Sequence, residues 1–235
     1  IMTGTFINIA AILIGGTIGL IFGARISERY KRTVIAGMGL FTVVMGLQMF
    51  LKSGNQLIVL GALIIGALIG EWLKIEDRLQ AFGQALEQRF SQEAETGTGS
   101  KFVRGFMVAS LLFSIGPMAI LGSIQDGLTG DYNLLAVKST LDGFASIAFA
   151  STLGVGVLFS SIITLIYQGG ISLLARQLNA IVTVPMMNEM TATGGVILLG
   201  LAISNLLEIR KIRVGNFLPA LAVAPLIVWI IEVLK

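Results

Sequence analysis

Hydrophobic residues form runs of membrane-spanning length along most of the chain, separated by short polar or charged segments. About 20 consecutive apolar residues suffice to cross a bilayer. Such runs occupy residues 5–24, 33–51, 55–74, 102–122, 190–208 and 215–234. The run 134–175 is too long for one crossing, and we divide it near Leu153 and Gly154 into two helices joined by a tight glycine turn. The pattern therefore predicts an all-α polytopic membrane protein with about eight transmembrane helices.

The segment Lys138–Gly170 is apolar enough to enter a bilayer, yet it carries Lys138, Asp142, Gln168 and many serines and threonines. Charged and hydroxyl side chains are costly in lipid and normally face a protein interior or a water-filled cavity. Asp142 follows Lys138 by one helical turn, so the two side chains can form an ion pair. One interpretation is a structural ion pair. In the other, Asp142 binds a cation or cycles a proton, and Lys138 is its partner or extends to the membrane interface.

The basic residues predict the orientation. Positive clusters in short loops favour the cytoplasmic side. Arg25–Arg32 and Arg210–Arg213 are the two clusters, and both face the cytoplasm only if 134–175 crosses twice. We therefore expect eight spans with both termini outside. Residues 76–100 are then cytoplasmic. Residues 76–90 are either an amphipathic interfacial helix or a plain solvated connector, and residues 95–100 are a flexible linker. Gln177–Met187 is interfacial or re-entrant.

An internal repeat appears when the chain is shifted by 134 residues. The shift places GALIIGALIGEWLKIE, residues 61–76, on GVILLGLAISNLLEIR, residues 195–210. The same shift pairs Asn8 with Asp142 and Glu71 with Asn205, in each case an acid with an amide. We predict two related four-helix halves, 1–122 and 134–235, within one integral membrane unit, in a parallel repeat whose axis lies along the membrane normal. The alternative is chance similarity among glycine-rich helices.

Further polar residues lie near the predicted span ends. Glu189 comes at the start of the seventh span, where it either caps the helix or lines an entrance. A proline lies within the fourth span, in Ser114-Ile115-Gly116-Pro117, and Gln125 and Asp126 follow it. This segment is either a simple proline kink followed by a turn, or a broken helix of the kind that borders transporter sites. The candidate solute- or ion-binding residues are Asp142, Asn8, Asn205, Glu71, Glu189, Lys138, Asp126 and Gln125.

The amino-acid composition excludes several classes of function and of partner. The chain is 55% hydrophobic and 12% charged, against about 25% charged in soluble domains. It has no cysteine and no histidine, which removes thiolate and imidazole metal ligands and nucleophile–histidine catalysis. No phosphate-binding loop and no basic patch with interleaved aromatics is present. We expect no enzyme, no cofactor, no metal site and no nucleic-acid partner. The expected partners are the lipid bilayer and a small solute or cation. Formation of a homo-oligomer is compatible with the sequence.

Five segments carry a resemblance to a known family. They are FVRGFMVASLLFSIGPMAILGSIQDGLTGD, KSTLDGFASIAFASTLGVGVLFSS, YQGGISLLA, NEMTATGG and KIRVGNFLPALAVAP. The chain closely resembles the YqgA/YdfK-type bacterial inner-membrane proteins, a family of unknown function named "possible transport protein". The resemblance covers almost the whole chain and implies a multi-pass protein of the bacterial plasma membrane, without a substrate.

The sequence thus favours a secondary transporter or channel for a small solute or ion. Its site would lie near the membrane midplane between the two halves, with Asp142 as the principal charge. Acids and amides without histidine or cysteine suit a hard cation or an amine-bearing solute. The alternative is a scaffold or sensor that binds partner helices through glycine faces without transporting anything.

The orientation can be tested by cysteine labelling, because the chain has no cysteine of its own. Single cysteines replace Ser27, Thr98, Thr129 and Lys235, and intact cells are exposed to an impermeant thiol reagent. We expect the first two positions to be protected and the last two to be labelled. Protection at position 235 would contradict an even number of spans with both termini outside.

Overall fold

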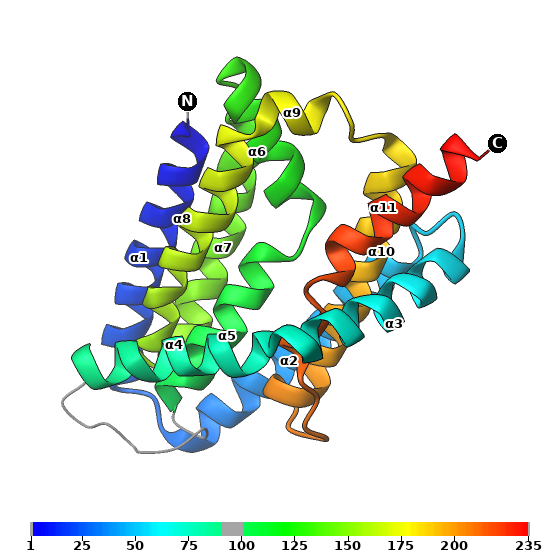
Figure 1. The fold of residues 1–235 in the computed structure, drawn as a ribbon. Helices are drawn as coiled ribbons and strands as arrows, with labels where there is room; N and C mark the ends of the chain where they lie inside the picture. The colour runs from blue at the N-terminus through cyan, green and yellow to red at the C-terminus, as the bar shows by residue number, and fades with distance from the viewer. Residues whose placement is uncertain (1, 91–100, 235) are drawn as a thin grey trace. The chain divides into compact units, whose positions relative to one another are not determined.

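The computed structural model describes residues 2–90 and 101–234, and within these ranges every regular element is a helix (Figure 1). The elements are α1 (Thr3–Gly23), α2 (Glu28–Phe50), α3 (Gln56–Leu73), α4 (Ile75–Phe90), α5 (Lys101–Ser114), α6 (Pro117–Thr129), α7 (Asn133–Leu153), α8 (Gly156–Leu173), α9 (Ala175–Asn179), α10 (Val184–Leu201), the π-helix η1 (Ala202–Leu206), the 3₁₀-helix η2 (Val214–Phe217) and α11 (Ala220–Val233).

The described residues contain seven helices long and apolar enough to cross a membrane, or up to eight if the bent pair α5–α6 is one span. The all-α membrane fold predicted from the hydrophobic runs is therefore confirmed. The long run 134–175 divides at the predicted place, since α7 ends at Leu153 and α8 begins at Gly156. Gly154 between them has φ of 83°, a backbone conformation that glycine adopts without a steric penalty.

The helix break at Pro117 is sharper than a simple kink. Helices α5 and α6 meet at 64° across a short break, and Gly116 in the break has φ of 156°. Pro117 is the first residue of α6, a position that requires no backbone N–H donor and suits the fixed φ of proline. The sequence allowed either a simple proline kink followed by a turn or a broken helix, and the observed geometry is that of a broken helix.

Two connecting segments also have defined structure. Residues 75–90 form the helix α4, as one of the two interpretations of this segment predicted, while the expected linker 95–100 lies outside the described residues. The segment Gln177–Met187 contains the end of α9, a turn, and the first residues of α10.

The chain divides into two compact units. The first contains residues 1–37, 80–114 and 118–180, and the second contains residues 38–79, 115–117 and 181–235. Each unit takes segments from both of the halves that the sequence repeat suggests, 1–122 and 134–235. The repeat itself stays a prediction, and the two units are described separately below.

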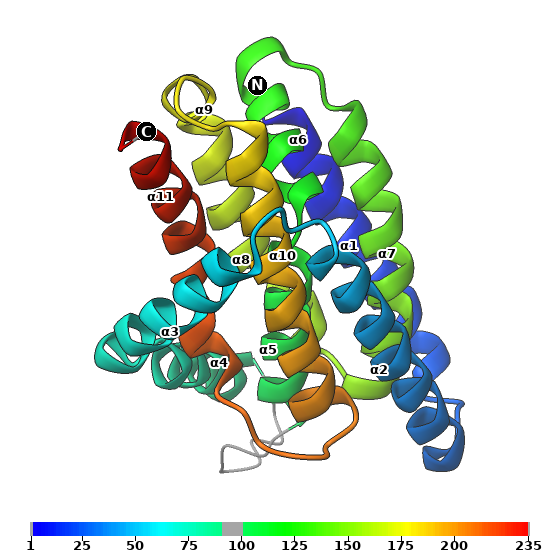
Figure 2. The same cartoon turned by 90° about the vertical axis from the view of Figure 1, so that its right-hand side faces the viewer.

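In the first unit, α1 packs along α7 and α8, and α5 packs on α8 (Figures 1 and 2). Three glycines spaced by four residues, Gly15, Gly19 and Gly23, form the contact with α7. A Cβ atom at these positions would overlap the backbone of Gly143, Ile147 and Ser151, respectively. The contacted residue numbers rise together, so α1 and α7 run parallel. Such small-residue contacts allow helix backbones to approach closely in lipid.

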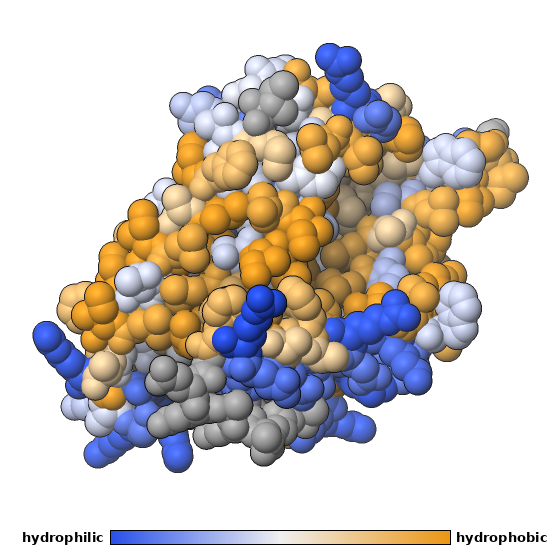
Figure 3. Space-filling view, turned by 60° about the vertical axis from the view of Figure 1, so that its left-hand side comes forward, coloured by the Kyte–Doolittle hydropathy of each residue, from blue (hydrophilic) through white to orange (hydrophobic). Residues whose placement is uncertain are grey.

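The outward and inward faces of α1 differ in chemistry. Phe6, Ile14 and Ile21 are more than half exposed, whereas Thr5 and Asn8 are fully buried. Hydrophobic side chains likewise cover most of the face drawn in Figure 3, and hydrophilic ones gather near its lower edge. A helix with apolar residues outside and polar residues inside is suited to lipid as its solvent.

The second unit uses glycine contacts too, between antiparallel helices. Gly66 and Gly70 of α3 lie against Ala220, the first residue of α11, and Asn216 of η2, respectively. Ala62, Ala220, Val223 and Ala224 form the buried apolar cluster between α3 and α11. Small side chains thus set the helix spacing in this unit as well.

The α1–α7 contact predicts an asymmetric response to alanine at two helical glycines. Gly19→Ala would place a methyl group against the α7 backbone, and we expect it to destabilise the protein by about 1–3 kcal/mol. Gly37→Ala is the matched control, because Gly37 is exposed, lies within α2 and has no atom within 4 Å of the added Cβ. Thermal unfolding in detergent measures both. Equal midpoints for the two variants would contradict the close approach of α1 and α7.

Candidate functional site

The predicted polar residues Asn8, Lys138 and Asp142 meet inside the first unit. The Asn8 side-chain amide of α1 donates a hydrogen bond of 3.0 Å to Oδ2 of Asp142 on α7. Lys138 forms an ion pair with the same oxygen from one turn earlier on α7. All three side chains are buried, and the Lys138 ammonium lies 5.9 Å from the centre of the Phe113 ring. The glycine contacts between α1 and α7 bring these polar groups within bonding distance.

This arrangement has the geometry of a structural pair. Lys138 and Asp142 neutralise one another, and Asn8 ties their charge to the neighbouring helix. A buried ion pair is weak evidence of stabilisation, but removing one partner leaves an uncompensated charge. The geometry also leaves the Asn8 Oδ1 atom, which is buried, without a hydrogen-bond partner among the described residues.

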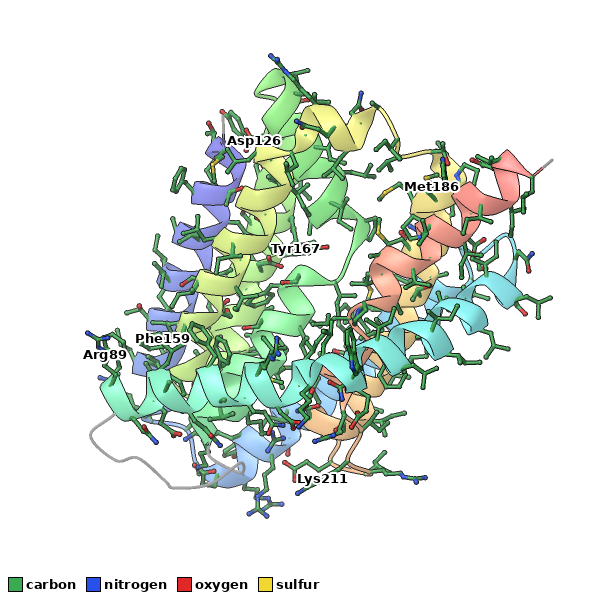
Figure 4. All side chains as sticks on the ribbon, in the orientation of Figure 1. Arg89, Asp126, Phe159, Tyr167, Met186 and Lys211 are labelled. Atoms are coloured by element: carbon green, nitrogen blue, oxygen red, sulfur yellow. The ribbon has the colours of Figure 1, made fainter. Side chains whose placement is uncertain are left out.

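A second buried carboxylate, Asp126 on α6, lies at the beginning of α1 (Figure 4). Its Oδ2 atom accepts a hydrogen bond of 2.9 Å from the backbone N–H of Gly4, in the first turn of α1. The helix amino terminus carries partial positive charge, which favours a carboxylate there. Asp126 is completely buried, and its other oxygen, Oδ1, has no partner among the described residues.

Buried polar atoms without a partner are concentrated in this unit. Over the described ranges 2–90 and 101–234, ten such side-chain atoms occur, and all belong to the first unit. Both polar atoms of the Gln168 amide are among them. The complete set is Thr5 Oγ1, Asn8 Oδ1, Ser110 Oγ, Ser114 Oγ, Ser123 Oγ, Asp126 Oδ1, Ser146 Oγ, Thr164 Oγ1, and Gln168 Nε2 and Oε1.

The number of these atoms is energetically important. An unsatisfied buried polar group costs about 1–3 kcal/mol. Even at about 1 kcal/mol each, ten would cost about 10 kcal/mol, which is comparable with the whole stability of a typical protein, about 5–15 kcal/mol. Polar groups in such numbers are compatible with a stable fold when water or a polar solute satisfies them.

Gln125, although adjacent to Asp126, does not join the buried groups. Its side chain is exposed, and its backbone carbonyl accepts a hydrogen bond from the Thr129 hydroxyl at 3.0 Å. Asp126 and Gln125 therefore have different environments, because neighbouring residues on a helix point in different directions.

Glu189 belongs to the second unit and holds a turn in place. Helix α10 begins at Val184 with Thr183 as its N-cap, so Glu189 lies in the second turn and does not cap the helix. Its carboxylate accepts hydrogen bonds from the Ser53 hydroxyl at 2.7 Å and from the backbone N–H groups of Gly54 and Asn55 at 2.8 and 2.9 Å. Glu189 thus anchors the α2–α3 turn to α10.

Glu71 also belongs to the second unit and forms a polar network at the end of α3. Its carboxylate accepts hydrogen bonds from Arg213 at 2.6 Å and from the Asn216 amide at 2.5 Å. Asn216 in turn accepts a hydrogen bond of 2.8 Å from the backbone N–H of Glu76. Asn205 is half-buried in the π-helix η1. The structure therefore brings Asn8, Lys138 and Asp142 together, and it places Glu71, Glu189 and Asn205 in the other unit.

Gln168, Ser123 and Thr5 are buried polar residues of the first unit that were not among the predicted site residues. Gln168 has a signal in the sequence, because an amide within a spanning run is costly in lipid. Ser123 and Thr5 have no such signal, since single hydroxyls commonly bond to the backbone of their own helix. Their lack of a partner becomes visible only in the packed structure.

Comparison with known proteins agrees with this membrane architecture. The family described as "Protein of unknown function (DUF554)" matches residues 3–229. The chain belongs to the DUF554 family. The "Uncharacterized membrane protein YdfK" of Bacillus subtilis is 31% identical over 235 residues, covering 98% of this chain and 97% of the relative. The "Uncharacterized protein YqgA" of Escherichia coli is 31% identical over 221 residues, covering 94% of each. No solved structure matches.

The resemblance to YqgA/YdfK-type proteins is thereby confirmed, and this DUF554 protein is a membrane protein with several apolar spans.

The buried pair of this DUF554 protein predicts non-additive effects on stability. Lys138→Met alone strands the Asp142 carboxylate, and Asp142→Asn alone strands the Lys138 ammonium. We expect each to cost about 3–5 kcal/mol. The double variant removes both charges and should recover most of that loss. Thermal unfolding of the single and double variants in detergent tests this coupling, and additive losses would show that the pair is not a structural unit.

Proposed function

We propose that this DUF554 protein is a secondary transporter or channel for a small solute or ion in a bacterial plasma membrane, and that it has no enzymatic activity. The supporting observation is the concentration of unpartnered buried polar atoms in the first unit, inside helices that are apolar on their outer faces. A purely structural membrane core gains nothing from such atoms, because they are costly without water or a polar ligand. A path for a polar solute requires them.

The position of the site between the two predicted repeat halves has its own support. Asn8 belongs to the first half and Asp142 to the second, and they are repeat mates that bond directly to each other. The helices that carry them run parallel, as a parallel repeat requires. The broken helix α5–α6 adds to this, because broken helices border the sites of many transporters.

The sequence motifs limit the possible sources of energy for transport. The sequence has no phosphate-binding loop, so a gradient of solute or ion, or a partner protein, supplies the energy for any net movement. Oxygen and amide groups line the polar interior without histidine or cysteine, which suits a small hard cation or an amine-bearing solute.

The alternative function, a scaffold that binds partner helices through glycine faces, has less support. The glycines of α1 at positions 15, 19 and 23 already contact α7, and those of α3 at positions 66 and 70 contact α11 and η2, respectively. These surfaces are occupied within the same chain, so they are not free for a second protein.

Transport is tested by flux into sealed vesicles that contain the purified protein. The probes are Na⁺, K⁺ and methylammonium, each supplied as a gradient and compared with empty vesicles. We expect the wild type to carry at least one of them above the empty-vesicle rate. Flux at the empty-vesicle level for all three would contradict this function and favour a non-transporting module.

Gln168→Met links that flux to the buried polar interior. Methionine has a similar volume and no polar group, so the variant should fold at least as stably, because it removes an unsatisfied amide. We expect flux to fall by about tenfold, equivalent to a barrier increase of about 1.4 kcal/mol. Gln88→Met is the matched control, since Gln88 is exposed on α4. Unchanged flux in the Gln168→Met variant would show that transport does not depend on these buried polar groups.

A further inference from the structure

We propose that Asp126 is the charged group of a binding site for a small monovalent cation, formed with Thr5, Ser123 and Gln168 at the beginning of α1. These four residues are called the Asp126 site below. The inference rests on the proposed transport function and assigns its substrate class, and it gives Asp142 a structural role.

Three helices bring the Asp126 site together. The Ser172 hydroxyl of α8 donates a hydrogen bond of 3.0 Å to the backbone carbonyl of Ser123 on α6. Ser172 contacts Ser123 and Gly127, and Ala175 contacts Gly127, so α6 and α8 run in the same direction. Asp126, one turn after Ser123, and Gln168, one turn before Ser172, therefore lie on the faces that pack together, with Asp126 nearer the ends of the two helices and Gln168 deeper along the same interface. Gly127, next to Asp126, also lies against the Ser172 backbone.

The beginning of α1 closes the site from the third side. The Gly4 N–H donates to Asp126, and Thr5 is the next residue along the same helix. The Met2 side chain reaches the position of Gly169, the neighbour of Gln168 on α8. All four residues of the site are at least 99% buried, and each has an unpartnered polar atom.

Charge distinguishes Asp126 from Asp142. Lys138 compensates Asp142 within the same helix. Asp126 is buried with a backbone N–H as its partner, and among the described residues it forms no ion pair with a lysine or arginine. A buried carboxylate without a compensating cation is costly, and binding a cation removes that cost.

The available donors select the class of cation. The unpartnered oxygens are those of one carboxylate, one amide and two hydroxyls, all hard ligands that suit an alkali ion or an ammonium group. Calcium sites normally use several carboxylates. The described residues hold no group of three or more histidine, cysteine, aspartate or glutamate side chains suited to a metal ion. A single negative charge therefore favours a monovalent cation, and the Gln168 Nε2 donor can bind one of the hydroxyl oxygens or a water.

Cation binding is measured on the purified full-length protein by thermal unfolding, because a ligand that binds only the folded state raises the midpoint. The protein is titrated with NaCl, KCl or methylammonium chloride, with N-methylglucamine chloride keeping ionic strength constant. The first two probes report an alkali-ion site, and the third reports an amine site. We expect at least one of them to raise the wild-type midpoint in a saturable way.

Asp126→Asn should weaken that binding by at least tenfold while keeping the shape of the side chain. Asp131→Asn is the matched control, because Asp131 lies in the exposed α6–α7 loop and accepts a hydrogen bond from the backbone N–H of Asn133. Its binding should equal that of the wild type. No stabilisation of the wild type by any of the three cations, or full binding in Asp126→Asn, would overturn the inference.

If Asp126→Asn does not fold, Gln168→Met provides the test, since it leaves the charge in place and removes a ligand of the cation. We expect its dissociation constant to rise by about tenfold, and an unchanged constant would overturn the Asp126 site. Vesicle flux separates the two proposals. Asp126-dependent binding without flux keeps the site and rejects transport, whereas flux that persists in Asp126→Asn keeps transport and rejects the site.

Discussion

The close approach of α1 and α7 decides where the polar groups of the first unit lie. In lipid no hydrophobic force drives helices together, so packing and hydrogen bonding must do so. The glycines at 15, 19 and 23 let the two backbones touch, and Asn8 then reaches Asp142 from one helix to the other. A larger residue at Gly19 would separate the helices and lengthen that hydrogen bond. Packing by small residues and the placement of charge are therefore parts of one constraint.

Much of the architecture follows from physical rules that act along the chain. Span lengths, the turn at Gly154 and the one-turn spacing of Lys138 and Asp142 were predictable, because each depends on local geometry. The roles of Glu189 and Asp126 were not. Glu189 binds the turn that contains Asn55, and Asp126 binds the first turn of α1, and both contacts join segments more than 100 residues apart. A sequence shows that a carboxylate is costly in a membrane, but the packed structure shows what compensates it.

The charges and hydrogen-bond donors next to each carboxylate also decide which one remains available to bind a ligand. The sequence makes Asp142 the most conspicuous charge, because it lies within a spanning run. The structure shows that Lys138 and Asn8 already occupy its Oδ2 atom. Asp126 looks like part of a loop in the sequence, yet it is buried with one oxygen free of partners in the described part of the chain. The less conspicuous carboxylate is therefore the better candidate for a cation, since its charge is less compensated.

The bonds of Asn8 and Asn55 support the predicted repeat. The side-chain amide of Asn8 donates to Asp142 in the first unit, and the backbone N–H of Asn55 donates to Glu189 in the second. Both pairs are separated by 134 residues, the offset of the repeat. In a parallel repeat, residues near the symmetry axis meet their own mates. Two acids meeting in that way would repel each other, because like charges in a shared buried site cannot both ionise cheaply. An acid that meets a side-chain amide, as Asp142 meets Asn8, makes a hydrogen bond instead. At Asn8 and Asp142, the departure from strict symmetry is thus what allows the two mates to touch.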